Sequence, residues 1–174
     1  VALEGYHSPQ MDVAVRLNTN ESPLPPPAEF ADALAEATRV IGWNRYPDRG
    51  AVRLRTALAE RYGVGADQVF AANGSNEVIQ SLFLAYGGSG RSVAVFEPTY
   101  AMYAQIARST GTRVVRGRRE PDFALAPTVV ADLLDTERPD LVVLCSPNNP
   151  TGTLDPENLV SEVVEAAGSY GGLV

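Results

Sequence analysis

The feature that most constrains the fold is a regular alternation of strand-like and helix-like segments that begins after Gly63. Short apolar runs of strand length, such as those at 92–96 and 141–145, are separated by segments whose apolar residues recur with helical spacing. Parallel strands need long crossover connections, and a helix is the usual one. The alternation therefore predicts an α/β fold with a mostly parallel sheet.

The expected elements extend over most of the chain. Strands are predicted at 68–72, 92–96, 113–115 and 141–145, and helices at 28–41, 52–62, 76–86, 100–109, 128–134 and 156–167. The pattern divides the chain into an irregular N-terminal arm at 1–27, a helical lead-in at 28–62 and an α/β region at 63–174. Because residues 171–174 have the pattern of the start of another buried strand, we expect the sheet to continue in a longer domain.

Composition excludes several classes of function. With 174 residues, 45% of them hydrophobic and 20% charged, the chain is typical of one globular domain. The formal charge of -7 argues against nucleic-acid binding, and no apolar stretch is long enough to cross a membrane. Cys145 is the only cysteine and His7 the only histidine, so neither a disulfide nor a metal site is expected. We interpret a cluster of arginines between Arg113 and Arg119 as the solvated end of a strand.

Three turn segments follow predicted strands, at the edge of an open α/β sheet where ligands bind. They are Asn73–Glu77 (NGSNE), Pro98–Tyr100 (PTY) and Ser146–Gly152 (SPNNPTG). The first could hold a phosphate, because Gly74 allows a tight turn and the start of the following helix presents unpaired N–H groups. The aromatic side chain of the second could stack on a ring cofactor. Each segment alone is more typical of an ordinary turn or helix start.

In combination and in this order, the segments resemble those of the histidinol-phosphate aminotransferase family, whose members are fold-type I enzymes that use pyridoxal 5'-phosphate (PLP). Two further segments, Leu17–Glu21 (LNTNE) and Arg45–Asp48 (RYPD), strengthen the resemblance, which extends from Arg16 to Val174. The resemblance implies a three-layer α-β-α fold, the aspartate aminotransferase-like large domain of the PLP transferases. In this chain that domain would be incomplete and would follow the N-terminal arm.

The resemblance also implies which residues contact the cofactor. Gly74, Ser75 and Asn76 would hold the PLP phosphate through backbone N–H groups at the start of a helix. Tyr100 would stack on the pyridine ring. Asn149 would donate a hydrogen bond to the phenolic oxygen of that ring.

Further implied roles concern a partner subunit and the substrate. Tyr46 would reach the cofactor phosphate of a neighbouring subunit, so the resemblance implies a homodimer. Asn20 and Ser22 lie where the family lines its substrate pocket, although Ser22 replaces a tyrosine that some members carry. The peptide bonds Glu97–Pro98 and Asn149–Pro150 are expected to be cis.

The implied reaction transfers the amino group of L-glutamate to imidazole-acetol phosphate, which gives 2-oxoglutarate and histidinol phosphate in histidine biosynthesis. A cytoplasmic location is expected, because no secretory signal pattern opens the chain. The chain contains no lysine, and the lysine that anchors PLP in the family is expected beyond Val174, so we predict that these residues alone are inactive. Two alternatives remain open. One is another fold-type I PLP enzyme, such as a threonine-phosphate decarboxylase or an aromatic aminotransferase, and the other is a non-catalytic fragment.

Overall fold

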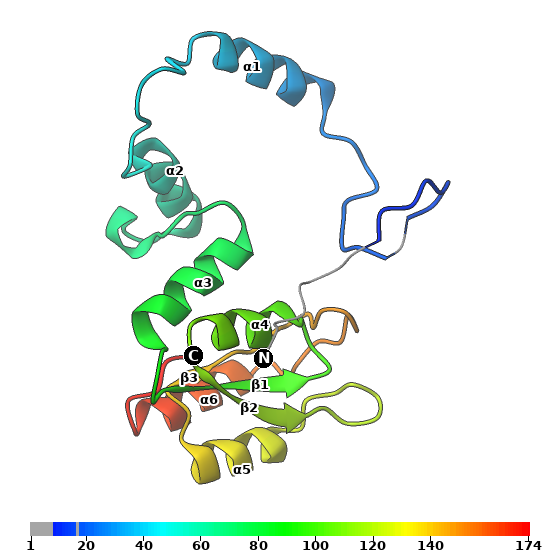
Figure 1. Cartoon of the computed structure of the whole chain (residues 1–174), viewed down its shortest axis with the longest axis vertical. Coiled ribbons are helices and arrows are strands. Elements are labelled where there is room, and N and C mark those ends of the chain that lie inside the picture. Colours follow the sequence, from blue (N-terminus) through cyan, green and yellow to red (C-terminus); the bar gives the residue numbers. More distant parts are fainter. Residues whose placement is uncertain (1–8, 17) are drawn as a thin grey trace. The chain divides into compact units, whose positions relative to one another are not determined.

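The computed structural model describes residues 9–16 and 18–174 (Figure 1). The described residues divide into two units, which we call the lead-in unit (residues up to Ala71) and the sheet unit (Ala72–Val174). Among the described residues, no helix has both the length and the apolar character needed to cross a membrane.

The sheet unit is built on three parallel strands in the order β2-β1-β3. They are β1 (Ser92–Glu97), β2 (Arg113–Arg118) and β3 (Leu141–Val142). β1 pairs with β2 along its full length, and its first half pairs with β3. Leu173 forms a parallel bridge with Leu141, as expected if residues 171–174 begin another strand. The predicted parallel sheet is confirmed.

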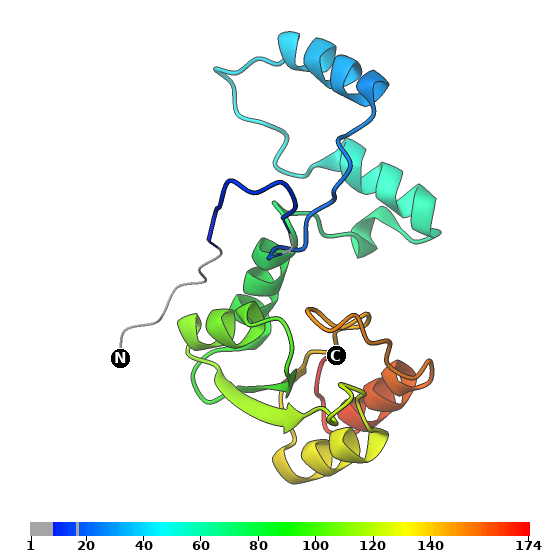
Figure 2. The ribbon, with the colours of Figure 1, turned by 90° about the vertical axis from the view of Figure 1, so that its right-hand side faces the viewer.

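Helices cover both faces of this sheet (Figures 1 and 2). They are α3 (Ser75–Tyr86), α4 (Met102–Ser109), α5 (Pro127–Glu137) and α6 (Leu159–Gly168). Ala94 and Phe96 of β1 pack with residues of α5 and α6. Val93 and Val95 point to the other face and pack with residues of α3 and α4. Because both faces are covered, β1 is apolar almost throughout, and the arrangement is the predicted three-layer α-β-α fold.

The strand order places a switch point between β1 and β3. The connection from β1 to β2 runs through α4 on one face, and the connection from β2 to β3 runs through α5 on the opposite face. Ligands of open α/β sheets bind at such a point, outside the carboxyl ends of the two strands. The segments that follow β1 and β3 are therefore the first place where a site is expected.

The lead-in unit is irregular in its described residues up to 27 and helical after them. Its elements are α1 (Ala28–Arg39), α2 (Val52–Tyr62) and the short 3₁₀ turn η1 (Ala66–Gln68). α2 has the predicted bounds, and Gly63 ends it in a left-handed backbone conformation with a φ of +67°. Arg55 of α2 donates hydrogen bonds to the carbonyl oxygens of Ala66 and Val69, so η1 is folded back onto this helix.

The RYPD segment forms a turn whose aspartate stabilises the start of α2. The Asp48 carboxylate accepts hydrogen bonds from the backbone N–H groups of Val52 (2.8 Å) and Gly50 (2.9 Å). These two bonds hold the pKa of Asp48 below its usual range. This residue of the motif therefore has a local structural role that the sequence analysis did not foresee.

Two predicted strands differ from the structure. The segment 68–72 is not a strand, because a strand needs a hydrogen-bonded neighbour and none of the described residues pairs with it. β3 ends at Val142 rather than at Cys145. The Cys145 carbonyl accepts a hydrogen bond from the Arg119 guanidinium instead of joining a strand ladder. The other predicted helices and strands are present, with bounds that shift by three residues or fewer.

Candidate functional site

The start of α3 presents backbone N–H groups that no side chain caps among the described residues. Gly74 precedes them with a φ of +83°, and no atom lies within 4 Å of the position where a Cβ would stand. The Asn73 N–H donates to the Glu77 carboxylate (2.6 Å), which fixes this turn, and both Ser75 and Asn76 are exposed. An open turn rich in N–H groups suits an anion such as phosphate.

Tyr100 follows β1 and contacts the start of α3 directly. Its hydroxyl donates a hydrogen bond to Oδ1 of Asn76 (3.2 Å). The Tyr100 ring meets the Tyr103 ring edge-on, with centroids 5.5 Å apart and ring planes at 84°. The structure thus brings together two residues with predicted cofactor roles that are 24 positions apart in the sequence.

A buried asparagine, Asn148, fixes the segment after β3 and is only 2% exposed. Its side-chain amide donates hydrogen bonds to the Pro98 carbonyl (3.0 Å) and the Thr151 hydroxyl (2.8 Å). Its side-chain oxygen accepts a hydrogen bond from the Thr99 hydroxyl (2.9 Å). Asn148 therefore joins the segments after β3 and β1 across the switch point. Asn148 is not among the residues predicted from the sequence, although the doubled asparagine of SPNNPTG was a signal that could have indicated it.

Asn149 lies next to this buried residue and is itself half-buried. Its backbone N–H donates to the Cys145 sulfur (3.4 Å), whereas its side-chain amide has no hydrogen-bond partner in the part of the chain that the structure describes. The Asn149 amide is therefore available to a ligand. The peptide bonds Glu97–Pro98 and Asn149–Pro150 are cis, as predicted, and Ser146–Pro147 is also cis, which the sequence analysis did not foresee.

A buried ion pair holds the base of the same segment. The Arg119 guanidinium contacts both carboxylate oxygens of Asp155, at 2.7 and 3.2 Å, and the two side chains are 1% and 2% exposed. The guanidinium also donates to the carbonyl oxygens of Phe123 (3.1 Å) and Cys145 (3.3 Å). Arg119, which directly follows β2, is therefore hydrogen-bonded to both ends of the segment 145–155.

This ion pair corrects the interpretation of the arginine cluster, which extends from the first residue of β2, Arg113, to Arg119 just after the strand. Arg113 pairs with Glu137 and Arg116 pairs with Glu97, each at 2.9 Å and each with exposed side chains. For these two arginines the predicted solvated strand end is right. For Arg119 it is wrong, because a carboxylate distant in the sequence supplies a partner inside the protein.

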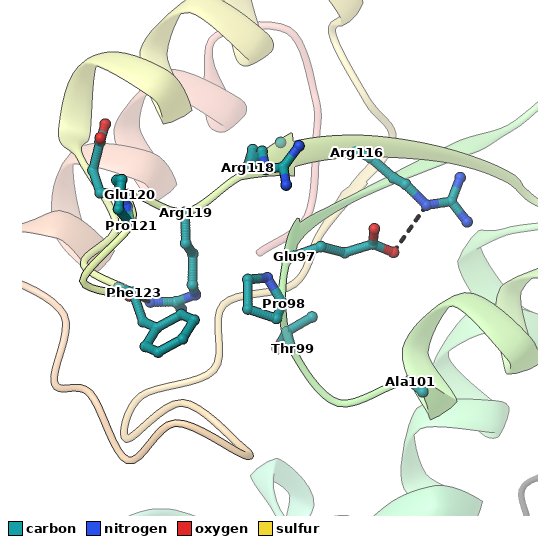
Figure 3. A pocket seen from close by; sticks show the side chains of 11 residues that line it. Glu97, Pro98, Thr99, Ala101, Arg116, Arg118, Arg119, Glu120, Pro121 and Phe123 are labelled. Atoms are coloured by element: carbon teal, nitrogen blue, oxygen red, sulfur yellow. Dashed lines mark hydrogen bonds and ion pairs between the residues drawn. The ribbon is translucent and has the colours of Figure 1, made fainter.

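A cavity of about 1260 Å³ lies at the carboxyl ends of β1 and β2 (Figure 3). Residues of the segments 97–101 and 116–123 line it. Figure 3 shows the ion pair of Arg116 with Glu97 on one side and Phe123 beside Arg119 on the other. None of the residues with predicted cofactor roles lines this cavity, so it lies beside the candidate site.

The other predicted site residues, Tyr46, Asn20 and Ser22, lie in the lead-in unit. Tyr46 is 99% exposed and Asn20 is also exposed. The Ser22 hydroxyl accepts a hydrogen bond from the Leu24 N–H (3.2 Å) and thereby forms a local turn. The contacts of these three residues with a cofactor or a substrate stay predictions.

The donor set of the sheet unit fits PLP, which carries a phosphate, an aromatic ring and a phenolic oxygen. The open turn at Gly74 suits the phosphate, the half-buried ring of Tyr100 suits the pyridine, and the available amide of Asn149 suits the phenolic oxygen. The three-layer fold defines the class: the chain has the fold of the aspartate aminotransferase-like enzymes.

Comparison with known proteins identifies the family. The chain belongs to the family described as aminotransferase class I and II, which matches residues 12–174. It is 50% identical over 178 residues to the histidinol-phosphate aminotransferase of Frankia casuarinae and 45% identical over 166 residues to that of Thermobifida fusca. These matches cover 96% and 93% of this chain but 45% of each relative. The chain thus spans about half the length of the curated relatives it matches.

Solved structures support the same assignment. The aspartate aminotransferase from Thermus thermophilus with maleate aligns with a TM-score of 0.80 at 26% identity, covering 90% of this chain and 43% of that chain. The alanine aminotransferase from Pyrococcus furiosus aligns with a TM-score of 0.79 at 26% identity, covering 91% of this chain and 43% of that chain. The predicted aspartate aminotransferase-like fold is confirmed.

Proposed function

We propose that the sheet unit supplies the phosphate, ring and phenolic-oxygen contacts of a PLP site. The hydrogen bond between Tyr100 and Asn76 carries this proposal, because it puts an aromatic ring beside the uncapped N–H groups of α3. The N–H groups at Ser75 and Asn76 bind the phosphate beside the open turn at Gly74, whose own N–H donates to the Ala72 carbonyl (2.9 Å), and the ring of Tyr100 orients the pyridine plane. The Asn149 amide donates to the phenolic oxygen. PLP, when bound, supplies the electron sink that transamination requires.

We further propose that this chain forms part of a longer histidinol-phosphate aminotransferase. That enzyme would transfer the amino group of L-glutamate to imidazole-acetol phosphate and release 2-oxoglutarate and histidinol phosphate, within histidine biosynthesis in the cytoplasm. The 50% identity to the enzyme of Frankia casuarinae, over 96% of this chain, supports the choice of substrates.

The proposed organisation is an arm at 1–27, a helical lead-in at 28–62 and the first part of a PLP-binding domain from residue 63. Tyr46 reaches the cofactor phosphate of the second subunit of a homodimer, and Asn20 and Ser22 line the substrate pocket. Because these 174 residues include no lysine, we propose that the chain alone does not transaminate and that residues outside it supply the covalent anchor.

The test is an assay of the complete gene product with PLP, L-glutamate and imidazole-acetol phosphate, with 2-oxoglutarate as the measured product. Formation of 2-oxoglutarate that depends on both PLP and the phosphorylated acceptor is the expected result. Activity with a different oxo acid, and none with imidazole-acetol phosphate, would assign the protein to another group of aminotransferases. Release of carbon dioxide from threonine phosphate, offered to the same protein with PLP, would favour the decarboxylase alternative.

A further inference from the structure

The arginines at the end of β2 line a cavity that contains none of the residues with predicted cofactor roles. Successive side chains of a strand point to opposite faces, so Arg116 and Arg118 share one face and Gly117 points to the other. That other face is packed, because a Cβ on Gly117 would collide with the ring of Phe96. Arg116 and Arg118 are exposed, and both line the cavity (Figure 3). The open face of β2 therefore presents two cations to it.

These two guanidinium groups have hydrogen-bond donors that the protein does not use. Arg116 donates through Nε to the Glu97 carboxylate (2.9 Å), and its terminal nitrogens form no hydrogen bond within the described part of the chain. Arg118 has no hydrogen-bond or ionic partner among the described residues. Glu120 also lines the cavity, but Figure 3 shows its carboxylate pointing away from Phe123. Planar guanidinium groups with free donors match the oxygens of a phosphate.

A buried donor in the cavity wall also lacks an acceptor. Arg119 lines the cavity, and its side chain is 1% exposed. Its two terminal nitrogens are bonded to Asp155 and to backbone carbonyls, whereas its Nε has no hydrogen-bond partner among the residues that the structure describes. Buried polar atoms of native proteins nearly always have a partner. An unpartnered donor beside a cavity therefore indicates that the cavity holds an acceptor.

Another part of the cavity wall is apolar. Phe123 and two prolines line it, and the Phe123 side chain is 44% exposed. Figure 3 shows this ring across the cavity from the pair of Arg116 with Glu97. The Phe123 backbone has a φ of +68°, which is unfavourable for a bulky residue. It is held there by its N–H, which donates to the Glu120 carbonyl (2.8 Å), and by its carbonyl, which accepts from Arg119 (3.1 Å). A ring fixed in this exposed position suits stacking with a flat ligand.

We propose that this cavity binds a small organic phosphate in which the phosphate group is attached to a flat ring. Arg118 and the free nitrogens of Arg116 bind the phosphate, and Phe123 stacks on the ring. A phosphate suits the site better than a carboxylate, because its additional oxygens and second charge can engage two guanidinium groups. The chain has a formal net charge of -7, so arginines gathered at one cavity form a local positive site on an acidic protein.

The binding test is a titration of the 174-residue chain with phenyl phosphate, followed by two-dimensional amide NMR. The amide signals of residues 116–123 are expected to shift. Arg118→Gln is expected to weaken binding about 10-fold, because one charge-assisted contact is lost at an exposed position. Arg113→Gln is the matched control, since this exposed arginine of the same strand pairs with Glu137 and does not line the cavity. The control is expected to leave the affinity unchanged.

A second variant tests the contact with the ring. Asparagine tolerates a positive φ better than most residues, so Phe123→Asn removes the ring without adding backbone strain. This change is expected to weaken phenyl phosphate binding about 2- to 10-fold, the value of one aromatic contact. The affinity for inorganic phosphate, which has no ring, is expected to stay the same. Equal losses for both probes would contradict stacking on Phe123.

The position of the shifted signals separates this inference from the proposed PLP site. Shifts confined to residues 73–77 would mean that phenyl phosphate binds only at the start of α3, and they would overturn the inference. Absence of binding, or an affinity that Arg118→Gln does not change, would overturn it as well. If both segments shift, only the shifts at 116–123 should weaken in Arg118→Gln. Shifts at 116–123 that depend on Arg118 support the inference whether or not the chain binds PLP.

Discussion

Removing the carboxylate of Asp155 should destabilise the sheet unit far more than removing an exposed ionic partner. Asp155→Ala leaves the Arg119 charge unpaired at a position where the side chain is almost fully buried. Breaking a buried ion pair by removing one partner costs about 3–5 kcal/mol in the free energy of unfolding. The structure favours the lower end, about 3 kcal/mol. The reason is that the guanidinium keeps its hydrogen bonds to the carbonyl oxygens of Phe123 and Cys145.

The assay is urea unfolding of the 174-residue chain, followed by circular dichroism. Arg116→Ala is the matched control, because it breaks an ion pair with Glu97 whose side chains are 40% and 46% exposed, and such pairs contribute about 0–1 kcal/mol. Replacing both buried partners, Arg119→Met with Asp155→Leu, should recover much of the loss, since no buried charge is then left unpaired. If Asp155→Ala costs no more than Arg116→Ala, the reasoning from burial is refuted.

Three further perturbations test other parts of the sheet unit. Asn148→Ala removes three side-chain hydrogen bonds. At about 1 kcal/mol each, their loss should appear as faster hydrogen exchange over residues 146–153, and unchanged exchange there would contradict the assigned role. Burial alone would raise the pKa of Asp140, but the Ser92 N–H and the Arg91 guanidinium lower it overall. The stabilisation by Asp140 is therefore present above about pH 4 and is lost as the pH falls through its folded pKa. Asp140→Asn should lower the urea midpoint at neutral pH and approach wild type in acid, so a difference that persists in acid would contradict this. Because the pKa of Tyr103 is raised, its contribution to stability is complete below about pH 10 and is lost at higher pH. Burial also raises the pKa of Tyr170, so an alkaline absorbance titration should show late-ionising tyrosines whose amplitude falls by one residue in Tyr103→Phe, and an unchanged titration curve would be evidence against the burial of Tyr103.

The parts of the fold that local sequence determines were predictable. β1 is covered on both faces, and this appears in the sequence as an uninterrupted apolar run. The bounds of α2 follow from its apolar spacing and from Gly63, which ends the helix in a conformation that glycine adopts easily. The segment 68–72 shows the limit of such reasoning. Its residues have strand character, but a strand forms only where another segment supplies hydrogen bonds, and no local pattern reports whether that segment is there.

In the site, the sequence pattern indicated the residues available to a ligand but not the residues that support them. Arg119 is one of several arginines near the end of a strand, and its burial depends on Asp155, 36 positions away. Asn148 and Asn149 are adjacent and chemically identical, so composition and spacing cannot separate them. The course of the backbone decides which of the two side chains points into the protein, and that course depends on contacts between the segments after β1 and β3.

The contrast between these two asparagines explains how the segment after β3 can be rigid and still bind a ligand. The Asn148 amide donates twice and accepts once within the protein, whereas the Asn149 amide has no partner among the described residues. Cys145 and the pair of Arg119 with Asp155 fix the backbone around them. A polar side chain without an internal partner, on a backbone held at several points, needs little further ordering when it binds. Asn148 therefore contributes to stability and its neighbour Asn149 to binding. A substitution of Asn148 should mainly lower the stability of the segment, and a substitution of Asn149 should mainly weaken ligand binding.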